Sequence, residues 1–308
     1  MKPVARWFDP VFLARPTLMY PIWIFFLAGY WSGSRWRAVP SVTRTDAVLI
    51  GIGLTAVMGA AYILNQIRDI ETDRINRKLF LLCDGHHGVR FAYQEAALLA
   101  FSGLFLGFTA DLRAGTLLTV LFLLAGWFYN YPPARWKDRP IAGLLVNGSG
   151  GLLISAAGWI AAGGAGWIPL RSLAYFGGFA AVTFNTMLPD IEGDRAAGKS
   201  TFAVRYGLRT TVVWALVAIT ATTVLSFLFT EWILFYPGLA MIPFFAFALT
   251  RKEVGDVIRA TKYSVLAMAV AVCVVFPWFL VPVFLVFFGS KWYYKQRFGM
   301  DYPNLKAK

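Results

Sequence analysis

Long stretches without charge are the feature that most constrains how this chain can fold. Eight stretches contain no Asp, Glu, Lys or Arg, and a ninth, 92–110, carries only Glu95. The eight are 16–34, 47–67, 114–134, 141–170, 172–189, 210–230, 232–250 and 263–290. Each comes close to or exceeds the ~20 residues that cross a bilayer as a helix.

This pattern predicts an all-α polytopic membrane protein with nine transmembrane helices. Stretches 141–170 and 263–290 are each counted once, because neither is long enough for two full crossings. Only 15% of the residues are charged, against about 25% in soluble domains. The alternative is a soluble protein with buried helices, but nine consecutive stretches of this length argue against it.

The basic residues indicate an orientation in the membrane. The net charge is +13, and 19 of the 29 Lys and Arg fall near the N-terminus or in four loops. These loops are 67–91, 132–140, 188–210 and 251–263. By the positive-inside rule we expect the N-terminus and these loops to be cytoplasmic and the C-terminus to lie outside. We expect no cleavable signal peptide, and the isolated Cys83 and Cys273 predict neither a disulfide nor a metal site.

A polar stripe continues the second span into the first of these loops. Asn65, Asp69 and Asp73 follow at intervals of four residues, so on a helix they share one face about 12 Å long. Carboxylates next to hydrocarbon are expected to face a cavity or a cation. The alternative is a solvated helix end, in which basic neighbours form i,i+4 ion pairs with the carboxylates. Those neighbours are Arg68, Arg74, Arg77 and Lys78.

A second acidic pair repeats this spacing after the sixth span. Asp190 and Asp194 are four residues apart, and Asp190 lies 121 residues after Asp69. Thr186, beside Asn185, stands where Asn65 stands in the first motif. Two unrelated solvated loops are the alternative. Two motifs on one face favour a shared cavity in which carboxylates hold Mg²⁺ around a diphosphate, since Mg²⁺ takes hard oxygen ligands and substrate phosphates.

The second motif overlaps a phosphate-binding pattern. "GDRAAGKS" (193–200) fits G-x-x-x-x-G-K-[ST], which typifies nucleotide hydrolases. That loop needs a preceding strand within an α/β sheet, whereas here an uncharged span precedes it. We therefore interpret Gly193 and Gly198 as bend residues that let Lys199 face a lipid diphosphate.

The loop after the fourth span supplies aromatic and cationic side chains. In "YNYPPARWKDRP" (129–140), Tyr129 or Tyr131 is a candidate for contact with a leaving diphosphate oxygen, with Arg135 or Lys137 as charge partner. The alternative is an aromatic belt followed by a positive-inside loop. His86 and His87 are adjacent and point apart on regular elements, so we interpret them as loop residues rather than metal ligands.

Together these segments resemble the UbiA superfamily of intramembrane prenyltransferases. "NQIRDIETDRIN" matches its N-x-x-x-D-x-x-x-D motif, and "DIEGDRAAGKSTFAVRYG" matches its second D-x-x-x-D motif with a Gly-Lys-x-Thr segment. "ARPTLMYPIWIFFLAGY" and "YNYPPARWK" resemble its N-terminal entry and its tyrosine-containing fourth loop. The resemblance covers roughly residues 14–290.

The resemblance implies a nine-helix fold around a central cavity, with a cytoplasmic active site and a lateral portal to lipid. It also implies two Mg²⁺ ions between the Asp motifs and a polyprenyl diphosphate. By position, the metal-diphosphate residues are Asn65, Asp69, Asp73, Asp190 and Asp194. Arg15, Arg68 and Lys199 are expected to bind the diphosphate. Two departures, "KLFLLCDGHHG" after the first motif and Arg135 four residues after Tyr131, affect the acceptor and the tyrosine's partner rather than the reaction class.

The sequence therefore predicts a single domain, 1–308, that transfers a prenyl group to an aromatic or lipid acceptor in a bacterial or archaeal cell membrane. Its pseudo-repeat halves span roughly 14–131 and 141–250, with a last helix at 263–290. Expected acceptors are a quinone-precursor ring, a chlorin, a carotenoid end or a glyceryl lipid, and no nucleic acid is expected. A cation- or proton-coupled transporter, which predicts acids near mid-span, and a non-catalytic lipid-binding scaffold are the alternatives.

Overall fold

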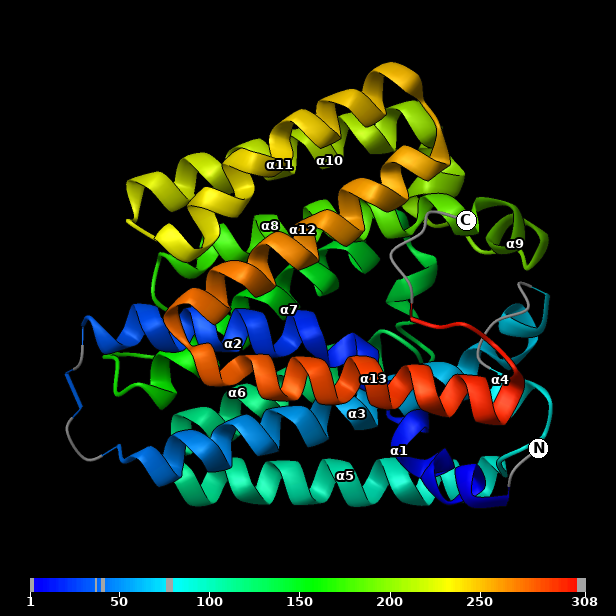
Figure 1. Cartoon of the computed structure of the whole chain (residues 1–308), viewed down its shortest axis with the longest axis horizontal. Helices are drawn as coiled ribbons and strands as arrows, with labels where there is room; N and C mark the ends of the chain where they lie inside the picture. Colours follow the sequence, from blue (N-terminus) through cyan, green and yellow to red (C-terminus); the bar gives the residue numbers. More distant parts are fainter. Residues whose placement is uncertain (1–2, 37, 40–41, 76–79, 304–308) are drawn as a thin grey trace.

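The chain folds into a bundle of long helices (Figure 1). The computed structural model describes all residues except 1–2, 37, 40–41, 76–79 and 304–308. The helices of the first half are α1 (Asp9–Leu13), α2 (Met19–Ser34), α3 (Arg44–Ile75), α4 (Phe80–Cys83), α5 (Val89–Ala110), α6 (Leu112–Phe122) and α7 (Pro140–Ala161). Those of the second half are α8 (Ser172–Thr186), α9 (Ile191–Ala196), α10 (Phe202–Leu228), α11 (Trp232–Arg251), α12 (Val254–Val275) and α13 (Leu280–Phe298).

Short turns of tighter or wider helix connect these elements. A π-helix, η3 (Leu123–Phe128), continues α6. The 3₁₀ helices are η1 (Pro3–Phe8), η2 (Pro16–Leu18), η4 (Trp136–Asp138), η5 (Leu188–Asp190) and η6 (Pro277–Phe279).

The predicted class, an all-α membrane protein, is confirmed, but the count of nine spans is not. Within the described residues, 7 helices are long and apolar enough to cross a membrane. Two predicted spans are shorter here: 114–134 corresponds to an apolar helix over Leu112–Phe128, and 172–189 corresponds to α8, which has 15 residues.

The prediction that 263–290 forms one last span is wrong. Pro277 has no backbone N–H and pushes the preceding residue out of the helical region. Phe276 accordingly has φ −124° and ψ 77°, and the stretch divides into α12 and α13. The uncharged stretch is too short for two full spans, but both helices extend into its charged flanks, so α12 reaches 22 residues and α13 reaches 19.

This division also corrects the predicted position of the C-terminal segment. Helix α13 runs back toward the end that holds α1 (Figure 1). There the Arg297 guanidinium lies 3.1 Å from the Asp9 carboxylate, and the Tyr293 hydroxyl donates to Asp9 at 2.6 Å. The last helix therefore ends on the same side as the N-terminal helix, not on the opposite side.

Small residues allow α2 and α7 to pack closely. A Cβ on Gly29 would collide with the Ser155 backbone, and one on Gly158 would collide with the Phe26 backbone. Around this contact α7 packs on α8, α8 on α10, and α12 returns to α2, while α3 packs against α5 and α6. Such small-residue contacts let helices associate where lipid offers no hydrophobic drive.

A buried carboxylate fastens the end of the bundle opposite α9. Glu231, at the start of α11, is fully buried. Its Oε1 accepts from Ser32 Oγ at 2.6 Å and from Arg171 Nη1 at 3.0 Å. Its Oε2 accepts from Tyr175 Oη at 2.8 Å, and Arg35 lies 3.5 Å from Oε1. Every donor comes from α2, α8 or a residue adjoining them, so this cluster fixes one end of both helices, and the other end of α8 leads to Asp190.

Candidate active site

Asp69 is the centre of a polar network near the end of α3. Its Oδ1 accepts from Lys137 Nζ at 2.8 Å and from Lys199 Nζ at 2.9 Å. Its Oδ2 accepts from Asn65 Nδ2 at 2.9 Å. The side chains of Asp69 and Lys137 are 13% and 6% exposed, so this charge cluster is largely withdrawn from water.

Lys199 joins the two acidic motifs. Besides its bond to Asp69, its Nζ lies 3.8 Å from Asp194 Oδ1. Asp194 is buried on α9, and the loop after α9 returns Lys199 toward α3 with Gly198 at φ 70°. Positive φ is easily adopted by glycine. The Lys199 ammonium therefore binds a carboxylate 130 positions away in sequence and also lies beside the carboxylate of the second motif.

The two lysines on Asp69 differ in their proton affinity. Burial lowers the pKa of the Lys137 ammonium, and attraction to Asp69 only partly offsets that effect. Burial also acts to lower the pKa of Lys199, but attraction to Asp69 and Asp194 outweighs it, so this pKa is raised. Lys199 is thus the more firmly protonated of the two.

The geometry distinguishes the two tyrosine candidates. Tyr129 Oη accepts from Asn147 Nδ2 at 3.3 Å, and its phenol experiences the charges of Asp69, Lys199 and Asp194. Burial raises the pKa of this phenol, which therefore remains a neutral hydroxyl. Tyr131 is instead 3.3 Å from the Tyr93 hydroxyl, and its ring lies under the Arg68 guanidinium. Tyr129 is the one beside the network.

The cation candidates separate in the same way. Arg135 forms a partly exposed ion pair with Asp138 at 2.8 Å, whereas Lys137 reaches Asp69. Arg68 is exposed, and Arg15 interacts with Tyr62 and Tyr294. No described contact of Arg15 or Arg68 involves Asp69 or Asp194.

The remaining predicted residues lie at the edges of the network. Asp73, one turn beyond Asp69, and Asp190, at the end of η5, are both half-buried. Thr186 is exposed and donates to the Thr183 carbonyl, so it does not occupy a position like that of Asn65, while neighbouring Asn185 is buried. Arg74 donates to the Cys83 carbonyl rather than to a carboxylate. Arg77 and Lys78 lie outside the described residues.

Two amides in the network were not singled out from the sequence. Asn147 donates to Tyr129, and Asn130, which is fully buried, accepts from Asn65 at 2.9 Å. The only sequence signal for either is a polar residue within or beside an apolar span.

The donor groups fit a divalent cation that arrives with a diphosphate. Among the described residues, no three His, Cys, Asp or Glu side chains are grouped to hold a metal on their own. Mg²⁺, however, is usually held by one or two carboxylates together with substrate phosphates. Asp69 and Asp194 already pair with the same cation, the Lys199 ammonium. Their oxygens therefore lie close enough together to bind one positively charged group.

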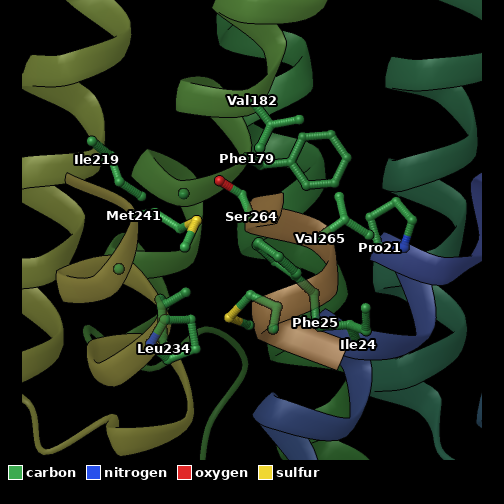
Figure 2. A pocket seen from close by; sticks show the side chains of 14 residues that line it. Pro21, Ile24, Phe25, Phe179, Val182, Ile219, Leu234, Met241, Ser264 and Val265 are labelled. Carbon is green, nitrogen blue, oxygen red and sulfur yellow. The ribbon is translucent and has the colours of Figure 1, made fainter. Parts of the chain in front are cut away.

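An apolar cavity of about 100 Å³ lies deeper in the bundle, between α2, α8, α10, α11 and α12. Figure 2 shows Phe25, Phe179 and Met241 around it, with Ser264 as the one labelled hydroxyl. Phe179 belongs to α8, whose far end leads to Asp190.

Sequence comparison identifies relatives over much of the chain. The UbiA prenyltransferase family model matches residues 22–257. A 2-acylphloroglucinol 4-prenyltransferase of Humulus lupulus is 34% identical over 176 residues, covering 51% of this chain and 41% of the relative. A lycopene elongase/hydratase of Halobacterium salinarum is 33% identical over 153 residues, covering 47% and 52%. The chain thus spans about half or less of these relatives.

Solved structures share the fold. A UbiA homologue from Archaeoglobus fulgidus bound to GPP and Mg²⁺ superposes with a TM-score of 0.68 at 20% identity, covering 85% of this chain and 98% of that one. A structure of digeranylgeranylglyceryl phosphate synthase gives a TM-score of 0.62 at 18% identity, covering 87% and 98%. With the family model matching well over half of its residues, this chain belongs to the UbiA prenyltransferase family.

Proposed function

We propose that this protein transfers a prenyl group from a polyprenyl diphosphate to an aromatic or lipid acceptor within the membrane. The observation that carries the proposal is the meeting of both acidic motifs at Lys199, beside Asp69 and Asp194. Relatives named as prenyltransferases, and a homologue bound to GPP and Mg²⁺, support it.

Asp69 and Asp194 hold the headgroup end of the donor in this proposal. Asp73 and Asp190 complete the set of oxygen ligands, and Asn65 orients Asp69 through the hydrogen bond from its Nδ2. Two Mg²⁺ ions, when bound with the donor, supply positive charge that stabilises the departing diphosphate.

The two lysines and Tyr129 act directly on the diphosphate. When Asp69 takes part in holding the donor headgroup, the ammonium groups of Lys137 and Lys199 turn from Asp69 to the diphosphate oxygens. Tyr129 offers its neutral hydroxyl as a hydrogen-bond donor to the leaving oxygen. In a water-poor site these preorganised groups stabilise the charge that develops as the allylic C–O bond breaks.

The reaction balances without an oxidant or reductant. The electron pair of the breaking C–O bond leaves with the diphosphate, and an acceptor carbon or oxygen forms the new bond and loses a proton. Apolar and aromatic helices exclude water that would otherwise capture the allylic cation. The apolar cavity of Figure 2 is suited to an isoprenoid chain.

We also propose that the network faces the cytoplasm. The fold adds Lys295 and Arg297, at the end of α13, to the basic residues on this side, which agrees with the positive-inside rule. Asp69 lies within the last two turns of α3 rather than at mid-span, which favours an enzyme over a cation-coupled transporter.

The test is prenyl transfer by the purified protein in nanodiscs. Radiolabelled prenyl diphosphates of several lengths are incubated with aromatic and lipid acceptors, with Mg²⁺ or with a chelator. Asp69→Asn and Asp194→Asn should each lower turnover by about 10²–10³-fold. Asp111→Asn is the matched control, because this ion-paired Asp caps α6 at the opposite end and Asn retains the capping oxygen.

Product formation that needs Mg²⁺ and is lost only in the first two variants supports the proposal. Transfer that proceeds equally with the chelator, or turnover in both Asp variants equal to that of Asp111→Asn, refutes it.

A further inference from the structure

Asn130 connects the π-helix to the first acidic motif. It lies two residues after η3 and is fully buried. Its amide makes three hydrogen bonds, two to the backbone and one to Asn65. A buried amide with these bonds has little freedom to turn.

The backbone fixes which way the Asn130 amide points. At the end of η3 the Tyr129 N–H reaches the Leu124 carbonyl, and the N–H groups of Asn130 and Tyr131 both turn to Trp127. The carbonyls of Ala125 and Gly126 are instead bound by Asn130 Nδ2, at 3.1 and 2.9 Å. Carbonyls only accept, so the NH₂ group must face them and Oδ1 must face the other way.

The orientation of Asn130 then fixes that of Asn65. Asn130 Oδ1 can only accept, so Asn65 must present its NH₂ group, 2.9 Å away. The same nitrogen donates to Asp69 Oδ2 at 2.9 Å. Both amide hydrogens of Asn65 are thereby committed, and its Oδ1 is left pointing away from Asp69.

We propose that Asn130 is a positioning residue that holds Asp69 in place through Asn65. This inference rests on the proposed function, because it assigns to Asp69 the task of gripping the donor headgroup. Without Asn130, the Asn65 amide can rotate and bring its oxygen against the Asp69 carboxylate, where two acceptors repel. Asp69 then loses the hydrogen bond that orients its Oδ2, although its Oδ1 keeps both lysines.

The test measures binding of inorganic pyrophosphate with Mg²⁺, so it needs no turnover. Asn130→Ala should weaken this binding by about 10–100-fold, the usual effect of losing a residue that orients a metal ligand. Asn130→Ser, whose hydroxyl can still donate to one carbonyl but is too short for Asn65, should weaken binding as much while unfolding at a higher temperature than Asn130→Ala.

Gln66→Ala is the matched control. Like Asn130, Gln66 is a buried amide that donates to two backbone carbonyls, in this case those of Leu13 and Tyr62. It lies on α3 but is not hydrogen-bonded to Asp69. It should lower the unfolding temperature and leave the pyrophosphate Kd unchanged. A double-mutant cycle with Asn65→Ala completes the test, since Asn130→Ala should add nothing to binding once Asn65 is gone.

Asn130 variants that bind pyrophosphate like wild type, or whose loss of binding is undiminished in the Asn65→Ala background, overturn the inference. If the wild-type protein binds pyrophosphate with Mg²⁺ but transfers no prenyl group to any acceptor, the proposed function is refuted. The role of Asn130 is then still decided by the Kd values of its variants. Wild-type protein that does not bind pyrophosphate with Mg²⁺ overturns both.

Discussion

The network predicts a particular order of stability loss when its members are removed one at a time. Asp69 accepts from two ammonium groups, at 2.8 and 2.9 Å, in a largely buried position. Asp69→Asn removes the carboxylate that Lys137 pairs with and leaves Lys199 only the more distant Asp194, at 3.8 Å. Removing one side of a buried ion pair costs about 3–5 kcal/mol.

The lysine variants should cost less. After Lys137→Met or Lys199→Met, Asp69 keeps the other ammonium and its bond from Asn65. The loss is then that of one charged hydrogen bond, about 1.5–3 kcal/mol.

Thermal unfolding of the detergent-solubilised protein without ligand measures this order. At about 2–4 °C per kcal/mol, Asp69→Asn should lower the midpoint by roughly 6–20 °C and each lysine variant by less. Glu253→Gln is the control, because its partly exposed pair with Arg251 is worth ~0–1 kcal/mol. A lysine variant less stable than Asp69→Asn would refute the arrangement of two cations on one carboxylate.

Three further predictions concern separate parts of the molecule. Glu231→Gln removes the charge opposite two arginines and should cost about 3–5 kcal/mol in thermal unfolding, while turnover per folded molecule stays at the wild-type value because the cluster lies at the far end. The pKa of Lys199 is raised in the folded protein, so its stabilising effect is complete below the unfolded pKa of about 10.4 and is lost as pH rises through the folded pKa. The difference in unfolding midpoint between wild type and Lys199→Met should therefore stay constant below the unfolded pKa and narrow only above it. Tyr129→Phe should lower kcat by about 10²-fold and Tyr131→Phe should leave it near wild type; equal effects of the two would contradict the placement of Tyr129.

Features that depend on local spacing were predictable from the sequence. Asn65 and Asp69 are four residues apart on a helix that continues to Ile75, and they are hydrogen-bonded as the helical period predicts. Glycine at 198 permits the bend that brings Lys199 toward α3. The pairing of Lys199 with Asp69 was not fixed by spacing, since it joins segments with four long helices between them.

The errors have equally local causes. Charged residues delimit the predicted spans, but α12 begins within the charged loop and α13 continues through Lys291 and Lys295. The uncharged stretch 263–290 therefore covers the end of one helix and the start of the next. Which of Tyr129 and Tyr131 faces the network depends on how far the π-helix turns the chain before Asn130. A single wider turn leaves no recognisable change in the spacing of apolar residues, so the sequence could not decide between them. Lys137 and Arg135 are two residues apart, and only the 3₁₀ turn η4 decides which one faces Asp69.

The most direct test of the central claim is a double-mutant cycle on pyrophosphate binding in the presence of Mg²⁺. Wild type, Asp69→Asn, Asp194→Asn and the double variant are compared by Kd. If both carboxylates act on one headgroup, their effects should be non-additive, with a coupling energy of about 0.5–3 kcal/mol. Strictly additive effects, or a Kd unaffected by either substitution, would contradict the account.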